Sequence, residues 1–519
     1  MNRLEMINTI KKIEDNLDFI VIGGGATGLG IALEASSRGY SVVLLEQSDF
    51  TKGTSSRSTK LVHGGVRYLA QGNITLVREA LRERGFMKKN APHLVKNQSF
   101  IIPSYKWWVK PYYTIGLTFY DLLSGKLSLG RSMPTSRKKT LECIPTLKTK
   151  GLKGGIIYHD GQFDDARFGI NLFQTIIEKG EIALNYMKVN SFIKKNNKII
   201  GITAIDQENG TEFKIKAKAV INATGVFIDD IIKMDTPNAN KMVCVSQGVH
   251  LVLDKEFVPN NYAIMIPKTS DGRVLFAVPW HNKVIVGTTD VVKENAELEP
   301  KALDEEINFI LETAGRYLAK QPKRSDIKSI FAGLRPLAMP KEGSLKTKEI
   351  SRRHKIIVSK SGLLSITGGK WTTYRQMAED VINQLIKNSN FKQTKSTTEN
   401  LKIHGYKKIV NYNNPLYVYG SDENKLLKLA KSENLEEYLS EPLKIIKAQV
   451  IWGARYEMAR TVEDILARRT RALFLDAKES VRIAPQVAKL LAKELDKDKK
   501  WEEIQIDKFN NVAKNYILN

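Results

Sequence analysis

The segment DFIVIGGGATGLGIALEASSRGYSVVLLEQSDF, residues 18–50, holds a glycine-rich turn between two apolar runs. The run at 19–22 is typical of a strand, the small residues of 26–38 favour a helix, and 41–45 favours a second strand that ends in Glu46. Strand, glycine turn, helix and acid-terminated strand together indicate a dinucleotide-binding β-α-β unit. The sequence therefore predicts an α/β fold that begins with a Rossmann-like domain.

The residues of this turn have separate physical roles. Gly23 permits the tight turn, Gly25 lets the backbone approach a pyrophosphate, and Gly28 lets the helix pack on the strand. Ala26 begins the helix, whose free N–H groups are available to phosphate oxygens. Glu46 is placed to accept hydrogen bonds from ribose hydroxyls and would repel a 2′-phosphate, which disfavours NADP. A glycine turn with a purely structural role is the alternative.

The next segment, TKGTSSRSTKLVHGGVRYL at 51–69, is dense in hydroxyls and glycine. An NAD domain would continue directly into another helix at this point. The ribityl chain and ring of a flavin instead need an extended, hydroxyl-rich path beyond the nucleotide. FAD is therefore the better expectation.

Two later segments bring the backbone back to the same place. AVINATG, at 219–225, is expected to end a strand in a second close backbone approach at Ala223 and Gly225. ITGGKWTTYR, at 366–375, repeats the order of strand, glycine turn and helix. A chain that leaves a dinucleotide domain to build a second domain must return to it. We expect this turn to close over the far end of the cofactor.

Composition restricts the class of protein. The 81 Lys and Arg exceed the 56 Asp and Glu and give a formal charge of +25. Such a field favours polyanions, anionic small molecules or an anionic membrane face without choosing among them, and solvated lysine-rich faces account for part of it. The cations are spread along the chain without a recognisable RNA-binding signature, so we expect no nucleic-acid partner.

Cysteines and apolar runs restrict the compartment. Cys143 and Cys244 are the chain's two cysteines, too few for a disulfide framework or a cysteine-rich metal site, and a reducing compartment fits. We expect no metal. The N-terminal residues lack the apolar core of a secretory signal. Apolar runs long enough for a transmembrane helix are absent from the sequence.

Several motifs together resemble the family of FAD-dependent glycerol-3-phosphate dehydrogenases. They are IGGGATGLG, TSSRSTKLVHGGVRYL, DDAR (164–167), INATG, GTTD (287–290), GLRPL (333–337), TGGKWTTYR and YEMARTVEDILARRTRALFLDA (456–477). The resemblance implies an FAD-binding Rossmann-like domain of the glutathione-reductase type, a mixed-sheet substrate domain and an α-helical C-terminal domain. It also implies oxidation of sn-glycerol 3-phosphate to dihydroxyacetone phosphate by hydride transfer from C2 to flavin N5, with electrons passed to membrane quinone.

Domain boundaries follow from these segments. We expect an N-terminal arm (1–17), a discontinuous FAD-binding domain (18–91, 151–240 and 341–390), a substrate-binding domain (92–150 and 241–340), a linker (391–400) and a helical C-terminal domain (401–519).

The resemblance also implies residues that contact FAD. They are Gly23, Gly25, Ala26, Gly28, Glu46, Thr54, Ser55, Ser56, Lys60, His63, Gly65, Ala223, Gly225, Gly369, Lys370 and Thr372.

A small phosphorylated substrate needs a clamp, and the planar guanidinium of arginine can donate two hydrogen bonds to phosphate. Arg335, in GLRPL, is expected to fill this role, against the alternative of a surface ion pair. Arg67 and Tyr68 resemble the family's substrate-contacting pair. The family's second phosphate arginine is matched best by Arg352 in KEISRRHKIIV, although the adjacent Arg353 stays open because it would point to the opposite face of a strand.

Two further residues resemble the family's catalytic and substrate-binding groups beside Arg335. His250 alternates with apolar residues on an expected strand, and its near-neutral reference pKa suits proton transfer. A histidine held in the core is the alternative, and another base stays open. Lys370 is expected near flavin and substrate, where a cation would stabilise negative charge on the reduced ring.

The segment WWVKPYYTIGLTFYDLL, at 107–123, mixes aromatic, apolar and basic residues. This mixture suits an interfacial anchor, and the alternative is packing inside the substrate domain or against the C-terminal helices. We expect a cytoplasmic protein bound peripherally to the inner, anionic face of the cell membrane. A homodimer is left open.

Two rival enzymes share the expected start of the fold. A glycerol-3-phosphate oxidase would hand electrons to oxygen and form hydrogen peroxide. An amine oxidase of the glycine-oxidase type would need a carboxylate clamp instead of a phosphate site.

Overall fold

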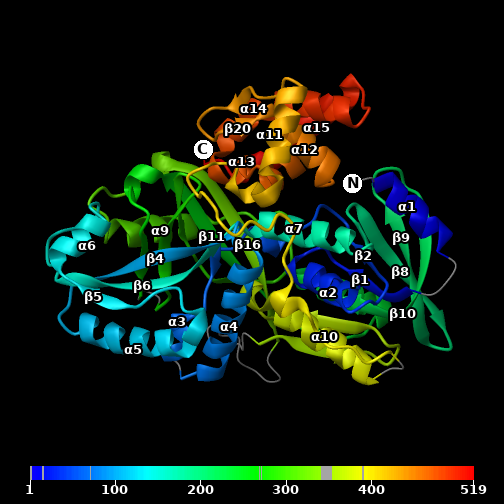
Figure 1. The fold of residues 1–519 in the computed structure, drawn as a ribbon, viewed down its shortest axis with the longest axis horizontal. Coiled ribbons are helices and arrows are strands. Elements are labelled where there is room, and N and C mark those ends of the chain that lie inside the picture. The colour runs from blue at the N-terminus through cyan, green and yellow to red at the C-terminus, as the bar shows by residue number, and fades with distance from the viewer. Residues whose placement is uncertain are drawn as a thin grey trace.

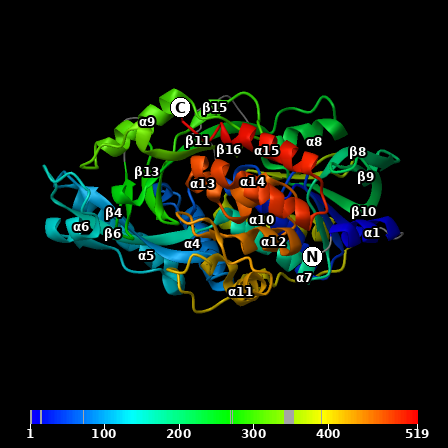
Figure 2. The same ribbon diagram turned by 90° about the horizontal axis from the view of Figure 1, so that it is seen from above.

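The computed structural model describes residues 3–13, 17–70, 72–267, 269, 272–339, 353–388 and 391–518. Two large sheets form neighbouring lobes, and the C-terminal domain lies across the junction between them (Figures 1 and 2). The expected α/β class with mixed sheets and a helical C-terminal domain is confirmed. Within the described ranges, no helix is both long and apolar enough to cross a bilayer.

The first sheet is the dinucleotide-binding one. Its order is β17 (Lys355–Val358), β18 (Leu364–Thr367), β10 (Glu212–Asn222), β1 (Leu17–Ile22), β2 (Val42–Leu45) and β7 (Ile182–Leu184), while β8 (Met187–Lys195) and β9 (Lys198–Asp206) extend β10. The pairs from β18 through β10, β1 and β2 to β7 are parallel. Parallel strands are buried on both faces, which explains the apolar runs at 19–22 of β1 and 42–45 of β2.

Helices cover this sheet. They are α1 (Arg3–Lys12), α2 (Ala26–Ser37), α7 (Asp165–Glu178), α8 (Ile228–Asp235) and α10 (Tyr374–Asn388). The small residues of α2 let its neighbours approach closely: a Cβ at Gly28 would lie 1.8 Å from Gly23 O, and one at Gly30 would lie 2.8 Å from the Tyr374 ring. The packing role expected of Gly28 follows from this contact.

The second sheet forms the other lobe of the molecule. Its order is β15 (Val291–Lys293), β11 (Val243–Asp254), β14 (Lys283–Gly287), β13 (Leu275–Trp280), β12 (Ala263–Ile266), β4 (Val95–Ser104), β6 (Gly154–Phe163) and β3 (Leu61–Val62), with β16 (Ile327–Ala338) on β11 and β5 (Met133–Thr135) on β6. Around it lie α3 (Val66–Ala70), α4 (Ile74–Asn90), α5 (Val109–Ser124), α6 (Arg137–Cys143) and α9 (Asp304–Gly315).

The strand pairing differs from the expected domain boundaries at two strands. β3, at 61–62, was expected in the FAD-binding domain but pairs with β6 in the second sheet. Residues 151–240 were expected in the FAD-binding domain, yet β6 pairs with β4 along its whole length, from Val95 opposite Phe163 to Ser104 opposite Gly154. This continuous register puts residues 154–163 in the sheet of the substrate lobe. Their apolar, glycine-rich sequence suits either sheet, so composition alone could not assign them.

The C-terminal domain is mainly helical. It contains α11 (Glu423–Ser432), α12 (Lys447–Tyr456), a π-helical turn (Asp464–Arg469), α13 (Ala472–Leu475), α14 (Ala477–Glu494) and α15 (Lys499–Ala513), with a small sheet of β19 (Tyr438–Ser440) and β20 (Ile445–Ile446). In Figure 1 this domain lies on the opposite side of the molecule from α5.

The expected linker lies along the dinucleotide domain. Phe391 packs on Phe19, with 4.8 Å between ring centroids. Further along, Ser396 Oγ donates to Glu34 Oε2 at 3.1 Å, and the hydroxyl of Thr398 donates to the same carboxylate. The segment therefore has a defined course despite its polar, low-complexity sequence.

Candidate active site

A cavity of about 950 Å³ is lined by residues of both sheets. The dinucleotide sheet contributes the turn after β1, the segment after β2 and the loop after β10, and the turn after β18 returns to the same cavity. The facing wall comes from β11 and β16. Three distant parts of the chain thus meet at one cavity, as the glycine-rich segments predicted.

The glycine turn forms a cradle that side chains would fill. Gly23 has φ +108°, and a Cβ there would lie 2.8 Å from Ala223 O. At Gly25 a Cβ would approach Ser55 Oγ to 3.1 Å. The first turn of α2 has no side-chain cap at Gly25, although Ala26 N donates to Ser55 Oγ at 2.9 Å. Close backbone approach at a helix N-terminus fits the pyrophosphate of FAD.

Glu46 lies in the cavity wall and also holds the turn. Its Oε2 accepts from Gly24 N at 2.6 Å and its Oε1 accepts from Ser48 N at 2.8 Å. Burial raises the pKa of the Glu46 carboxyl, although the two amide hydrogen bonds oppose the shift. The acid at the end of β2 therefore has a structural function in addition to any ribose contact.

The hydroxyl-rich segment divides into two faces. Lining the cavity are Thr54, Ser55, His63 and Gly65, together with Ala223 and Gly225 from the loop after β10 and Gly369 and Thr372 from the turn after β18. Two residues expected to contact FAD, Ser56 and Lys60, lie on the other face and do not line the cavity.

Lys60 corrects the expectation most clearly. Its Nζ donates to Asp165 Oδ2 at 2.8 Å and to Ser56 O at 2.6 Å, and the side chain is fully buried. Burial lowers the pKa of Lys60 to about 7, although Asp165 opposes the shift. The backbone at Lys60 is left-handed, with φ +62°, at the position where the side chain points into the core. The residue supports the segment from behind and does not line the cavity.

Arg335 lies on β16 opposite Ser246 of β11, and its guanidinium faces the cavity. One terminal nitrogen donates to Thr288 Oγ1 at 3.0 Å and Thr289 O at 3.1 Å, and the other to Gln247 O at 3.2 Å. A Cβ at Gly248 would lie 2.2 Å from this guanidinium, so Gly248 provides the space that Arg335 occupies. Arg335 also pairs with Asp290, 3.6 Å from its Oδ1, so the ion pair expected as the alternative is present beside the cavity.

His250 lies on β11 and is 2% exposed. Its ring stacks on Phe331 with 4.8 Å between centroids, and Nε2 lies 2.8 Å from Thr59 Oγ1. A Cβ at Gly287 would lie 2.4 Å from the imidazole. Burial, with the charges of Arg335 and Lys60, holds the pKa of His250 well below its ordinary value, which corrects the near-neutral pKa expected from the sequence.

Lys370 lies at the start of the helical turn that leads into α10, and its Nζ is 4.0 Å from the centroid of the Tyr68 ring. Both side chains line the cavity. The indole N–H of Trp371 donates to Ser55 O at 2.8 Å, which joins the returning turn to the hydroxyl-rich segment. Burial lowers the pKa of the nearby His63 to about 4, and the charge of Lys370 contributes.

Some expected substrate contacts fall outside this description. Arg352 lies outside the described residues, as does the side chain of Arg67. The alternative to Arg352, Arg353, is exposed and does not line the cavity.

Asp160 is a buried acid outside the motifs recognised in the sequence, and it supports the turn formed by His63, Gly64 and Gly65. Asp160 lines the cavity, and its carboxylate accepts from Arg84 at 2.8 Å and from the Tyr120 hydroxyl at 2.7 Å. Tyr120 in turn accepts from Gly64 N at 2.8 Å. Thr59 and Gly248 were also missed. In the sequence, Thr59 could be noticed only as a hydroxyl residue beside Lys60, and Gly248 only as a glycine two residues before His250.

Comparisons with known proteins agree with this geometry. The family described as FAD dependent oxidoreductase matches residues 18–375, and the C-terminal domain of alpha-glycerophosphate oxidase matches residues 364–502. Mitochondrial glycerol-3-phosphate dehydrogenase of Schizosaccharomyces pombe is 37% identical over 98% of this chain and 88% of its own. The human protein of that name is 38% identical over 94% of this chain and 72% of its own.

A solved structure extends the likeness to the fold. The glycerol-3-phosphate dehydrogenase from Bacillus halodurans, complexed with FAD, is 31% identical with a TM-score of 0.81, and the match covers 99% of this chain and 98% of that one. L-alpha-glycerophosphate oxidase from Mycoplasma pneumoniae, at 17% identity and a TM-score of 0.57 over 74% of this chain and 98% of that one, shares the fold. This chain belongs to the family of FAD-dependent glycerol-3-phosphate dehydrogenases.

Proposed function

We propose that this protein oxidises sn-glycerol 3-phosphate to dihydroxyacetone phosphate in the cavity between the two sheets and passes the electrons to a membrane quinone. The observation that carries the proposal is that Arg335, Lys370 and His250 line the same cavity as the glycine cradle. FAD, when bound, would supply at N5 the acceptor for a hydride from C2 of the substrate. The steps below concern the protein's own groups.

Arg335 would hold the phosphate. Its donors now meet the Thr288 hydroxyl at 3.0 Å and backbone carbonyls, and Asp290 Oδ1 lies 3.6 Å away. A phosphate oxygen is a stronger, charge-assisted acceptor, so we propose that it takes the place of this hydroxyl. Arg67 and Arg352 are proposed to complete the phosphate site, and Tyr68 to contact the substrate. Fixing one end of a small, flexible molecule places C2 in line for the transfer.

His250 would receive the C2 hydroxyl proton. Its lowered pKa keeps the imidazole neutral near pH 7, so a proton acceptor is always present. A weak base suffices here because the hydroxyl becomes acidic as the hydride leaves C2. Lys370 places a positive charge beside the cavity, where it would stabilise the negative charge that accompanies reduction. The cradle and Glu46 would hold the nucleotide half of FAD.

We further propose that α5 attaches the enzyme to the cytoplasmic face of the cell membrane. Exposed apolar side chains cover one side of the helix and its start: Trp107 (80% exposed), Trp108, Tyr112, Ile115 (73%), Phe119 and Leu122 (72%). The opposite side of α5 is buried through Leu117 and Tyr120. The sequence between residues 105 and 153 contains ten Lys or Arg residues but only two acids, Asp121 and Glu142. Aromatic rings and cations suit an anionic interface, close to quinone.

An anaerobic titration tests the reaction. Glycerol 3-phosphate added to the purified protein without oxygen should bleach the flavin absorption, whereas glycine and sarcosine should leave it unchanged. Bleaching by the amino acids alone would refute the phosphate site. After reduction, a soluble quinone should restore the absorption faster than dissolved oxygen does. Stoichiometric hydrogen peroxide in air, with no response to quinone, would favour the oxidase.

A further inference from the structure

Three arginines of the C-terminal domain reach into the FAD-binding lobe from a single turn. Arg468 and Arg469 end the π-helical turn 464–469, and Arg471 follows with a left-handed φ of +66°. They are 2%, 1% and 2% exposed. Burying three guanidinium groups is costly unless each meets charged or polar partners. They have partners in their own domain, but all three also contact groups of the FAD-binding lobe, namely Asp49, Ser56 O and Asp165.

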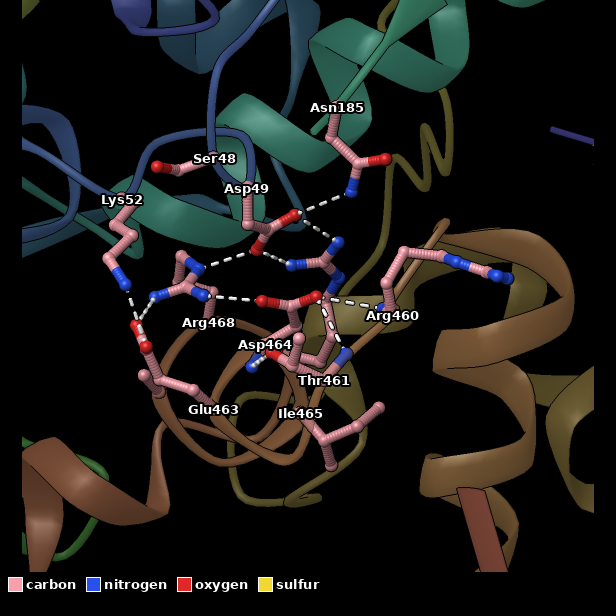
Figure 3. A network of polar contacts seen from close by, with 12 residues as sticks. Ser48, Asp49, Lys52, Asn185, Arg460, Thr461, Glu463, Asp464, Ile465 and Arg468 are labelled. Carbon is pink, nitrogen blue, oxygen red and sulfur yellow. Dashed lines mark hydrogen bonds and ion pairs between the residues drawn. The ribbon is translucent and has the colours of Figure 1, made fainter. Parts of the chain in front are cut away.

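The first partner is Asp49, directly after the cavity-lining residues 46–48. Arg469 donates to Asp49 Oδ1 at 2.9 Å. Arg468 donates to the other oxygen, and Asn185 donates to Oδ1 at 3.1 Å (Figure 3). Burial alone would raise the pKa of the fully buried Asp49, but Arg469 and Arg468 hold it below its ordinary value. The carboxylate is therefore charged and gripped from both sides.

Glu463, which directly precedes the π-helical turn, contacts the segment that follows Asp49. Glu463 accepts from Lys52, a cavity-lining residue, at 2.7 Å and from Arg468 at 2.7 Å (Figure 3). Next to Lys52, Thr51 N donates to Gly24 O at 3.0 Å. Residues 46–52 thus connect the C-terminal domain directly to the glycine turn.

Arg471 makes the second grip. Its guanidinium donates to Ser56 O and to Asp165 Oδ1, both at 3.0 Å. Asp165 also accepts from Lys60 and from Ser58 N, at 3.1 Å for the latter. The opposite face of this segment lines the cavity and includes Thr59, which contacts His250. Asp165 therefore connects the C-terminal domain to the part of the cavity wall that includes Thr59, beside His250.

The two gripped segments have little regular structure of their own. Between the end of β2 and the start of β3, the only helical element in the described chain is the short turn Thr54–Ser56. Backbone hydrogen bonds fix parts of this stretch, such as Tyr186 N to Ser48 O at 2.8 Å, and the side-chain bonds of the arginines add to them. Apolar side chains could stabilise a domain contact equally well, but they would not fix the positions of individual carbonyl and carboxylate groups.

We propose that Arg468, Arg469 and Arg471 are positioning residues, through which the C-terminal domain holds both cofactor-lining segments in their binding geometry. This role rests on the placement of FAD in the cavity proposed above. Arg468 and Arg469 act on the nucleotide end through Asp49, and Arg471 acts on the segment beside His250 through Asp165. The C-terminal domain is thus part of the cofactor site although it contributes no lining residue among those described.

Binding of FAD to the deflavinated protein tests the proposal. Arg469→Met should raise the Kd for FAD at least tenfold, and Arg469→Lys, which keeps a charge for Asp49, should restore part of the affinity. Arg471→Met should change the Kd less and should shift the flavin absorption and lower kcat with little change in KM. Arg455→Met is the matched control: Arg455 also pairs with two carboxylates of the C-terminal domain, Glu433 and Glu494, and does not line the cavity.

Thermal unfolding of the apoproteins separates positioning from simple loss of stability. We expect Arg469→Met to lower the apoprotein Tm more than Arg455→Met, because Arg469 is buried and Arg455 is partly exposed, but to remain folded at the assay temperature. Arg469→Met alone should lose FAD affinity and regain flavin at high FAD concentration. A wild-type Kd in Arg469→Met overturns the proposal, as does equal loss of affinity in Arg455→Met. If the wild-type protein itself binds no FAD, the placement of the cofactor fails first.

Discussion

His250 Nε2 lies 2.8 Å from Thr59 Oγ1, so the proposed proton acceptor contacts the same segment that is fixed from behind by Asp165. The histidine comes from the substrate lobe and the threonine from the region joining the two lobes. Phe331 supports the other side of the imidazole. The ring is therefore held in one orientation by parts of the chain that are far apart in sequence.

Replacing His250 by Asn should lower kcat and retain FAD. General-base catalysis typically contributes about 10²- to 10⁴-fold, which sets the expected loss. Because the pKa of His250 is well below 6.5, its imidazole does not titrate near pH 6.5. We therefore expect the pH profiles of the wild type and the variant to have the same shape near this pH. Steady-state kinetics from pH 5 to 9 provide the measurement. His159→Asn, away from the cavity, is the control, and normal turnover of His250→Asn at every pH would exclude His250.

Replacing Arg335 by Ala should raise KM for glycerol 3-phosphate. Losing a charge-assisted hydrogen bond costs about 1.5–3 kcal/mol, which corresponds to roughly 10- to 100-fold in KM when substrate binding equilibrates. The bound FAD and the anaerobic spectrum should not change. Arg324→Ala removes an exposed arginine paired with Asp304 and serves as control. A KM equal to that of the wild type would show that other groups bind the phosphate.

Replacing both Trp107 and Trp108 by Ser should weaken binding to vesicles that contain anionic phosphatidylglycerol. Activity with a soluble dye acceptor should stay at the wild-type level, because neither indole lines the cavity. Co-flotation with vesicles measures binding, with neutral phosphatidylcholine vesicles for comparison. Ile409→Ser removes another highly exposed apolar side chain, from the C-terminal domain, and should have no effect. Undiminished flotation of the double variant, or a change in its oligomeric state instead, would contradict the anchor.

Lys60 should make stability rise with pH above neutrality. Its folded-state pKa is about 7, whereas an unfolded lysine has a pKa of about 10.4. Between these values the unfolded chain binds the proton that the folded chain has released, so the free energy of unfolding increases with pH. Urea denaturation midpoints at pH 7 and 9 should therefore move upward in the wild type relative to Lys60→Met. The absence of a relative shift between pH 7 and 9 would show that Asp165 keeps Lys60 protonated over this range.

The dinucleotide half of the fold could be predicted because its sequence signals are local. The apolar runs around Gly23 and the small residues of α2 need no distant partner to be interpreted. The cavity-lining positions of Arg335 and Lys370 followed from family motifs. These residues come from different lobes, and only the folded chain places them at the same cavity.

The inward course of Lys60 and the lowered pKa of His250 could not be predicted. Both depend on burial and on charges that other segments supply, above all Asp165 and Arg335. Residues 154–163 were expected in the FAD-binding domain, which is wrong for a similar reason, since their partner β4 is set by pairing between segments distant in sequence. A pattern along the chain shows which residues are polar or apolar, and not which segment will face them.

The parallel pairing of β18 with β10 has a consequence for biosynthesis. A nascent chain leaving the ribosome exposes its dinucleotide fingerprint early, but the glycine turn at 368 and 369 and the arginine turn at 468–471 are translated much later. Until then the nucleotide cradle lacks one wall and its outer support. We therefore expect flavin capture to follow translation of residue 471, and a chain that stops before residue 468 should accumulate as a colourless product.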